Sequence, residues 1–363
     1  MTVDRDKVLG IGERVGSGHR LTRRECIELL KTKWVSELGR SATGFARTLH
    51  PDLDCTCTFV IDVNINYTNV CVARCAFCAF HRGSKDRDAY VRTKEEMLST
   101  IARLVEQGGT QVLLQGGHNP DIPFDYYLDL VKGIKKRFPR VHVHSFSPPE
   151  IWFFSRTFGM EPECVLRELK KAGLDSLPGG GAEILVDRVR KKVSPGKASA
   201  KEWFEVMRTA HEIGLPGTAT MMYGHAETVE DRAEHLLRVR ELQDETKGFT
   251  AFIPWSYQPD GTMLGGTRAS AVDYLRTVAA SRLMLDNVPN IQSGWLTEGG
   301  GIAQLALAFG ANDFGGVITQ EEVVKAAGGE YHLSLDDILR LIRATGRTPV
   351  QRDTYYRRMR SFD

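Results

Sequence analysis

The chain has 363 residues, of which 42% are hydrophobic and 26% are charged, and both values are ordinary for a soluble globular protein. Its 48 Lys and Arg residues nearly balance 46 Asp and Glu residues, so a net charge of +2 gives no electrostatic reason to expect a nucleic-acid or membrane-surface partner. No apolar run approaches the roughly 18 residues of a membrane span, and the charged start MTVDRDKVLG lacks the apolar core of a signal peptide. We therefore expect a cytoplasmic protein with one large domain or two of ordinary size.

From about residue 57, short apolar runs alternate with amphipathic segments. Apolar residues at helical spacing, such as Met97, Ile101 and Leu104, predict helices that pack on a core. We expect strands at residues 57–66, 110–115, 141–146, 175–177, 216–223, 249–255, 290–295 and 311–314. Eight strands that alternate with helices favour a parallel α/β sheet, and eight is the number that closes a (βα)8 barrel of the TIM type.

The expected barrel spans residues 57–320, which fits the usual length of about 250 residues. Residues 1–56 predict an N-terminal helical segment packed on the barrel, and residues 321–363 predict a C-terminal helical extension. A doubly wound open sheet is the alternative. It would carry a glycine-rich phosphate-binding turn after the first strand, where this chain has cysteines instead.

Seven cysteines are an odd number, in a chain too long to depend on disulfides. The segment NINYTNVCVARCAFCAF, residues 64–80, directly follows the first expected strand and contains the spacing C-x3-C-x2-C. Its cysteines are Cys71, Cys75 and Cys78. The C-terminal ends of the strands are where barrels of this kind place their active sites, so the cysteines are expected at the mouth of the barrel.

Three neighbouring thiolates favour an iron–sulfur cluster. A closed cubane cluster takes four thiolates, so three leave one iron with an open position for a substrate. Zinc is the alternative, but a zinc site would need a second cysteine pair or a histidine pair, and only His81 is close in sequence. Inert buried thiols remain a further possibility at this point.

The cysteine spacing, with the aromatic Phe77 just before the third cysteine, resembles the radical S-adenosylmethionine (radical SAM) superfamily. The resemblance implies a [4Fe–4S] cluster on Cys71, Cys75 and Cys78, whose open iron chelates the methionine part of S-adenosylmethionine. One electron then cleaves the sulfonium to give methionine and a 5′-deoxyadenosyl radical. A one-electron reductant such as flavodoxin or ferredoxin is therefore an expected partner.

The same resemblance gives roles to residues at other strand ends. Gln115, Gly116 and Gly117 would contact the methionine amino group, where a plain turn is the alternative. Glu183, after the glycines of PGGGAE, would bind the ribose hydroxyls of S-adenosylmethionine, although helix N-termini also favour acids in general. Phe77 is placed with these cofactor-binding residues.

Candidates for the substrate side come from later strands. Tyr223 and His225 are candidate catalytic residues that could move protons, and a loop-ordering hydrogen bond is the alternative for His225. Trp255 offers an aromatic wall for a flat ring. Arg82 is a candidate cation for a substrate carboxylate, and residues 312–316 are expected at the same mouth.

Two further motifs lie around the third expected strand. His142 and His144 share one strand face, and such a pair favours packing over metal binding. Pro148 and Pro149 then fix the backbone before Glu150, so this carboxylate has a definite direction.

Motifs such as HSFSPPEI, TATMMYGH and FIPWSYQP are similar to radical SAM enzymes of the futalosine route to menaquinone. This implies a small nucleoside-derived substrate, dehypoxanthine futalosine, and a C–C bond-forming cyclase reaction. The radical would take the ribose C4′ hydrogen, the sugar radical would attack the benzoate ring, and one electron and one proton would leave. Chemistry of the aminofutalosine synthase or FO synthase type is the alternative, and a non-enzymatic metal-binding protein is a more distant one.

Overall fold

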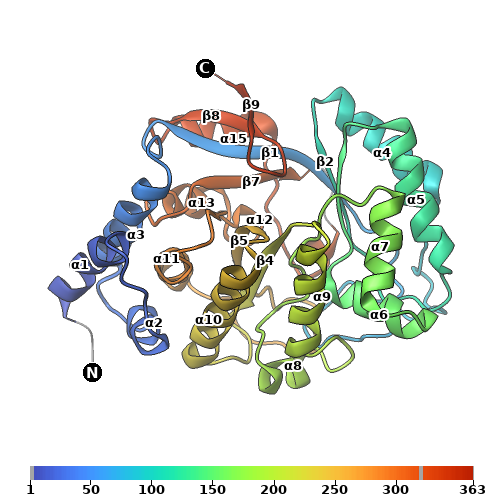
Figure 1. Cartoon of the computed structure of the whole chain (residues 1–363), viewed down its shortest axis with the longest axis horizontal. Coiled ribbons are helices and arrows are strands. Elements are labelled where there is room, and N and C mark those ends of the chain that lie inside the picture. The colour runs from blue at the N-terminus through green and yellow to red at the C-terminus, as the bar shows by residue number, and fades with distance from the viewer. Residues whose placement is uncertain (1–3, 319–321, 363) are drawn as a thin grey trace.

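The computed structural model describes residues 4–318 and 322–362. Its centre is a barrel of parallel strands enclosed by helices (Figure 1). The barrel strands are β1 (Thr56–Ile65), β2 (Gln111–Leu114), β3 (His142–Ser145), β4 (Gly217–Tyr223), β5 (Phe249–Ser256), β6 (Asn290–Ile291) and β7 (Asp313–Ile318).

The ring of strands closes through two sheets and the bridges between them. β1 pairs with β2 on one side and with β7 on the other, β2 pairs with β3, and β4 pairs with β5 and β5 with β6. Ser176 and Leu177 bridge β3 to β4, and Gln292 bridges to Asp313 of β7. The expected strand at residues 175–177 is thus present as two bridging residues, and the expected (βα)8 barrel is confirmed.

Most helices of the outer layer begin at residues that favour a helix N-terminus. Thr93, Ser199 and Thr228 form capping boxes in which a side-chain oxygen and an acidic residue satisfy free backbone N–H groups. The helices are α4 (Lys94–Glu106), α5 (Phe124–Arg137), α6 (Pro148–Phe158), α7 (Pro162–Ala172), α8 (Asp187–Val193), α9 (Ala200–Glu212), α10 (Val229–Thr246), α11 (Ala271–Met284), α12 (Trp295–Glu298) and α13 (Gly300–Ala306).

The N-terminal segment forms α1 (Arg5–Gly16), α2 (Arg23–Leu30) and α3 (Val35–Leu49). Figure 1 shows them at the side of the barrel next to α11, and α3 and α2 both contact α11. Helix α3 also packs closely against the residues after α13, because a Cβ atom at Gly39 would lie 2.8 Å from the ring of Phe309. In the described ranges, we find no helix with the length and apolar character needed to cross a bilayer.

The C-terminal segment contains helices α14 (Val323–Ala326) and α15 (Leu335–Arg343), followed by strands β8 (Thr348–Arg352) and β9 (Arg358–Ser361). The helices were expected, but the antiparallel β8–β9 hairpin was not. Its strands are short, and β8 contains Pro349, so they show no alternating pattern. β8 pairs in parallel with the first half of β1, and the hairpin therefore lies at the end of the barrel opposite the cysteine loop. We call this end the floor.

A buried ion pair closes the floor. Arg352 donates from Nε and Nη2 to the two carboxylate oxygens of Asp313, at 2.5 and 2.9 Å. The side chains are only 4% and 0% exposed. Tyr356 lies against the guanidinium, 3.8 Å from ring centroid to Cζ, and Thr58 donates a further hydrogen bond to Asp313. The hairpin is thus fixed to β7 and β1 by one fully desolvated charge pair.

We expect Asp313→Asn to lower the free energy of unfolding by about 3–5 kcal/mol, because it leaves the Arg352 charge buried without its counter-ion. Urea unfolding of the cluster-free protein measures the change. The matched control is Glu163→Gln, which breaks an exposed pair with Arg167 in which both side chains are more than half exposed. That control is expected to cost less than about 1 kcal/mol, and equal losses in the two variants would contradict the assignment.

Candidate active site

One cavity of about 380 Å³ runs inside the barrel from the cysteine loop to the floor. Barrels usually fill this space with branched apolar side chains. Here the inward positions of β1 carry Val60, Asp62 and Asn64, and Asn66 follows the strand directly, so three of these four residues are polar. A polar interior that is not filled by packing indicates a binding site.

Other segments of the chain fix the cysteine loop by backbone hydrogen bonds. The N–H of Val72 donates to the carbonyl of His118, and the N–H of Ala76 donates to the carbonyl of Val193, both at 2.9 Å. The N–H of His118 donates to Cys71 Sγ at 3.2 Å, which is a favourable contact for a thiolate. The loop is therefore tied to the residues after β2 and to the end of α8.

Cys71, Cys75 and Cys78 all line the cavity. Among the described residues, no three His, Cys, Asp or Glu side chains are placed to share a single metal ion. A zinc site needs such convergence, because all ligands lie about 2.3 Å from one ion. A cubane cluster makes a different demand, since each thiolate binds its own iron. The three thiols at one end of a cavity fit a cluster better than zinc.

Gln115, Gly116 and Gly117 line the cavity beside the cysteines. A Cβ atom at Gly117 would lie 2.1 Å from the carbonyl oxygen of Val70, so only glycine allows the two loops to meet. Glu150 holds this segment from behind: it accepts from the N–H of Gly116 at 3.1 Å and from Ser147 at the start of α6.

The glycine segment before Glu183 reaches the same place. A Cβ atom at Gly180 would lie 2.4 Å from Gln115 Nε2, so the two glycine motifs are in contact. Glu183 lines the cavity with a left-handed backbone, φ 41°. Its carboxylate accepts from Lys197 at 3.0 Å and from Arg190 at 3.2 Å. Burial alone would raise the pKa of Glu183, but these two cations outweigh it and hold the pKa below its usual value.

Lys197 is a residue of the site that could not be identified from the sequence. Its ammonium lies 5.2 Å from the ring centroid of Phe77, which also lines the cavity, and it contacts Glu183. One ammonium therefore joins the aromatic residue of the cysteine loop to the acid of the glycine segment. A lysine after SPG in a loop has no local pattern that would single it out.

Tyr223 and His225 were expected on the substrate side of the cavity, and the structure places them elsewhere. Neither is among the described residues that line the cavity, and both side chains are buried. The guanidinium of Arg232 covers the ring of Tyr223, and His225 contacts Glu227 and the carbonyl of Met222. The structure thus places both side chains in the loop after β4, outside the residues that line the cavity, and this arrangement gives no support to a role in proton transfer.

Arg82 also has partners of its own. It pairs with Asp88 at 2.7 Å and donates to the backbone carbonyls of three residues in its own loop. It does not line the cavity, so it holds the cysteine loop in shape and is not free for a carboxylate. Trp255, by contrast, lines the cavity as expected. Residues 312–316 were expected at the mouth, and this was wrong: Asp313 pairs with Thr58 in the first half of β1, so the segment lies toward the floor, where Gly316 lines the cavity.

The floor of the cavity holds polar residues that sequence analysis also missed. Gln111 donates to Asp62 at 3.1 Å and accepts from Thr354 of the hairpin turn at 2.7 Å. Burial raises the pKa of Asp62 to about 7, so this acid can hold a proton at neutral pH. The alternation of polar and apolar residues in IDVNIN was the one available signal, because a strand with Asp and Asn facing inward cannot line an apolar core.

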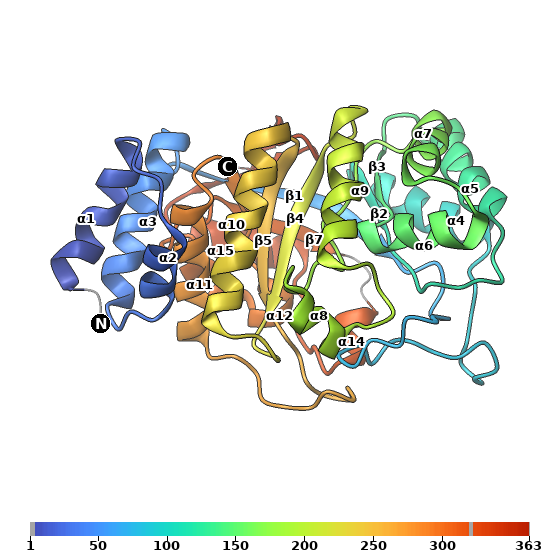
Figure 2. The same ribbon diagram turned by 60° about the horizontal axis from the view of Figure 1, so that its bottom comes forward.

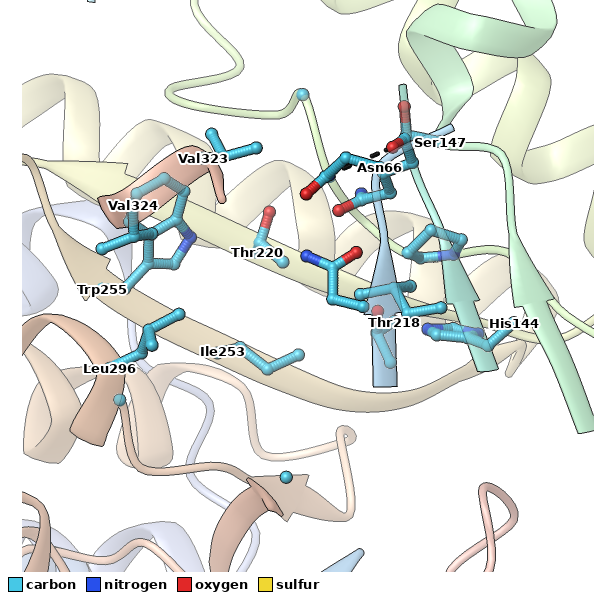
Figure 3. Close-up of a pocket in the computed structure, with 18 of the residues that line it drawn as sticks. Asn66, His144, Ser147, Thr218, Thr220, Ile253, Trp255, Leu296, Val323 and Val324 are labelled. Atoms are coloured by element: carbon cyan, nitrogen blue, oxygen red, sulfur yellow. Dashed lines mark hydrogen bonds between the residues drawn. The ribbon is translucent and has the colours of Figure 1, made fainter. Parts of the chain in front are cut away.

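The cavity has two chemically different regions (Figure 3). Trp255, Leu296 and Val324 form an apolar region on one side. Thr218 and His144 lie on the other side, with Thr220 and Asn66 between the two regions. The first region suits a flat apolar ring, and the second suits hydroxyl groups.

Two family models match the chain. The model described as the Radical SAM superfamily matches residues 65–239, and the model described as the CofH/MqnC C-terminal region matches residues 246–362. Together they cover the cysteine loop, the barrel and the hairpin.

Named relatives match over nearly the whole chain. The chain is 45% identical to the cyclic dehypoxanthine futalosine synthase of Halalkalibacterium halodurans, covering 98% of this chain and 95% of the relative. It is 41% identical to the protein of the same name from Streptomyces coelicolor, covering 95% and 87%. It is also 40% identical to the aminodeoxyfutalosine synthase of Thermus thermophilus, covering 98% and 97%.

Solved structures share the fold at low identity. Methylornithine synthase is 20% identical with a TM-score of 0.74, covering 93% of this chain and 97% of that one. The hydrogenase maturase HydG of Carboxydothermus hydrogenoformans is 16% identical with a TM-score of 0.73, covering 97% and 81%.

We expect Cys71→Ala, Cys75→Ala and Cys78→Ala each to abolish cluster binding and activity, because each thiolate would hold its own iron. Iron and sulfide counting after anaerobic reconstitution measures the loss. The controls are Ala variants of the four other cysteines, which do not line the cavity: Cys26, Cys55, Cys57 and Cys164. Loss of the cluster in any of these controls would contradict the assignment.

We expect Glu183→Gln to weaken S-adenosylmethionine binding about tenfold or more, since one charge-assisted hydrogen bond contributes roughly 1.5–3 kcal/mol. Equilibrium binding to the reconstituted protein measures this, with iron content as a check that the cluster is intact. Glu227→Gln is the matched control, because it also removes a buried carboxylate paired with an arginine, Arg232, but outside the cavity. Unchanged affinity in Glu183→Gln would remove this residue from the cofactor site.

Proposed function

The chain belongs to the radical SAM superfamily, and we propose that it cyclises dehypoxanthine futalosine to cyclic dehypoxanthinyl futalosine, a step of menaquinone biosynthesis. The observation that carries the proposal is that the cysteine triad, the two glycine motifs and a two-sided substrate chamber form one cavity. The two relatives named as synthases of this product support the choice of reaction.

Cys71, Cys75 and Cys78 would hold the cluster, which when bound would supply the one electron needed to cleave S-adenosylmethionine to methionine and a 5′-deoxyadenosyl radical. The residues around it bind and orient. Backbone atoms of Gly116 and Gly117 are accessible beside the cysteines, and the Glu183 carboxylate is fixed by two cations, ready to accept from ribose hydroxyls.

The two-sided chamber fits the two parts of the proposed substrate. Trp255, Leu296 and Val324 offer apolar contact to a benzoate ring. Thr218, which accepts from the N–H of Gly179, can donate its hydroxyl proton to a sugar, and Thr220, which donates to the carbonyl of Gly179, can accept from one. The reaction is intramolecular, so the protein has to hold the sugar carbon close to the ring. Positioning of this kind can contribute about 7–11 kcal/mol to lowering a barrier.

Exclusion of water is the second requirement, because a carbon radical has to reach its target before it is quenched. The buried Arg352–Asp313 pair closes the floor. At the mouth, α14 brings Val323 and Val324 onto the cavity, and Figure 2 shows α14 at the same end of the barrel as α8 and α12. The neighbouring Glu322 accepts from Tyr90 and Arg92, which ties this segment to the loop after the cysteines.

The electron has to come from outside the chain. Of the four cysteines beyond the triad, Cys26 and Cys57 are buried singly and Cys55 and Cys164 are exposed. We propose a small one-electron carrier such as flavodoxin or ferredoxin as the donor. The similarity to an aminodeoxyfutalosine synthase favours one second candidate, radical addition to form an aminofutalosine product.

We expect the reconstituted, reduced enzyme with S-adenosylmethionine and substrate deuterated at ribose C4′ to place the label in 5′-deoxyadenosine and to release cyclised product. Mass spectrometry of both compounds is the measurement. The substrate of aminodeoxyfutalosine synthase serves as the control and is expected to give no product. Label that stays wholly in the nucleoside would contradict the proposed abstraction, and turnover of the control substrate would favour the second candidate.

A further inference from the structure

Two histidines and a serine form a chain of hydrogen bonds at the inner face of β3. His142 and His144 are two residues apart and share a strand face. Ser176, one of the bridging residues between β3 and β4, lies between them. Its Oγ is 2.6 Å from His144 Nδ1 and 2.6 Å from His142 Nε2.

The hydroxyl of Ser176 gives this chain of hydrogen bonds a direction of donation. A serine hydroxyl has one hydrogen, so it donates to one imidazole and accepts from the other. Burial lowers the pKa of His144 to about 3 and that of His142 to about 4, so both rings are neutral at neutral pH. Each ring then has one N–H and one lone pair, which is what proton transfer along such a chain requires.

The two ends of the chain face different surroundings. His144 lines the cavity, and among the described residues no side chain or backbone group bonds to its Nε2. His142, at the start of β3, is half-buried on the floor side, where its ring meets the exposed Tyr355 of the hairpin turn at 5.0 Å. Asp175, paired with Lys135, lies close enough to raise the pKa of His142. The chain of hydrogen bonds thus runs from the substrate chamber to the floor-side surface.

We propose that His144, Ser176 and His142 form a proton relay that removes the final proton of the cyclisation and delivers it to solvent at the barrel floor. The inference rests on the proposed function, in which the ring attacked by the sugar radical has to lose one proton and one electron. The protein needs such a path because the cavity is otherwise closed below by the Arg352–Asp313 pair.

The transfer balances in protons and electrons. His144 Nε2 takes the ring proton as the C–H bond breaks, and its Nδ1 proton passes to Ser176 Oγ. The hydroxyl proton passes to His142 Nε2, and His142 releases its Nδ1 proton to water. The broken C–H bond leaves its electron pair on the ring and thereby restores aromaticity. The one surplus electron passes to an external one-electron acceptor of the flavodoxin or ferredoxin class.

Asp62 is the other base in the cavity. One of its carboxylate oxygens accepts from Gln111, and the other has no hydrogen-bond partner among the described residues. Asp62 could accept a proton but could not pass it on, because an amide side chain such as Gln111 does not relay protons readily. The two possibilities give different results on mutation.

The test uses two variants that can keep a hydrogen bond to Ser176 while removing the relay, and one that removes the hydroxyl itself. His144→Asn places an amide near Nδ1 but has no equivalent of Nε2, and His142→Gln places an amide near Nε2. Ser176→Ala removes the hydroxyl. We expect each to form labelled 5′-deoxyadenosine from C4′-deuterated substrate, but to yield cyclised product per deoxyadenosine about 10²-fold less often, in the range of a lost general base.

A matched control and a rescue separate a relay from a structural role. His211 also bonds to a hydroxyl, Thr246 Oγ1 at 2.7 Å, but does not line the cavity, so His211→Asn should leave the product ratio unchanged. His142 is reachable from the floor, so imidazole added to His142→Ala should restore the ratio. Thermal unfolding and iron content show that each variant is folded and loaded.

A normal product ratio in His144→Asn and Ser176→Ala would overturn the relay while the labelled deoxyadenosine still supports the proposed function. A fall in the product ratio that is confined to Asp62→Asn would overturn the relay and identify Asp62 as the base. An equal fall in His211→Asn would also overturn the relay, because it would show that the ratio responds to any buried histidine that is lost. Wild-type enzyme that forms no labelled deoxyadenosine would instead reject the proposed function itself.

Discussion

The structure depends on one constraint: every polar group buried inside the closed barrel has to be paired, because an unpaired one costs free energy. The floor meets the constraint with side chains. Arg352 neutralises Asp313, and Gln111 joins Asp62 to the hairpin. These pairs leave the middle of the barrel free for a ligand, where an ordinary barrel would be filled. The C-terminal hairpin is therefore part of the chamber.

The barrel and the cysteine triad could be predicted from the sequence because both leave local signals. Alternating apolar runs give the strands, and C-x3-C-x2-C is a short spacing. The β8–β9 hairpin could not be predicted, since Arg352 contacts Asp313 only after the ring has closed. An arginine near the end of a chain looks like part of a basic tail until its distant partner is known.

One physical cause explains why Tyr223, His225 and Arg82 lie outside the cavity lining. Tyr223 and His225 follow a strand end at the mouth, and position in the chain gave no information on which way each side chain turns. Arg232 on α10 contacts both Tyr223 and Glu227, so the loop turns toward the helix layer and away from the barrel axis. Arg82 likewise has its acceptors within its own loop, where it donates to three backbone carbonyls.

The cofactor end and the substrate end of the cavity are built in different ways. This difference limits how far sequence similarity to relatives can identify the substrate. At the cofactor end, Gly117 and Gly180 are required because backbone segments meet there, and such steric demands leave short motifs. At the substrate end, Thr218, Trp255 and His144 come from three separate strands, and no local motif joins them. Relatives with two different names can therefore match this chain at similar levels, at 45% and 41% identity for one name and 40% for the other. The side chains that line the chamber, more than the motifs at its mouth, are where the choice of substrate has to be made.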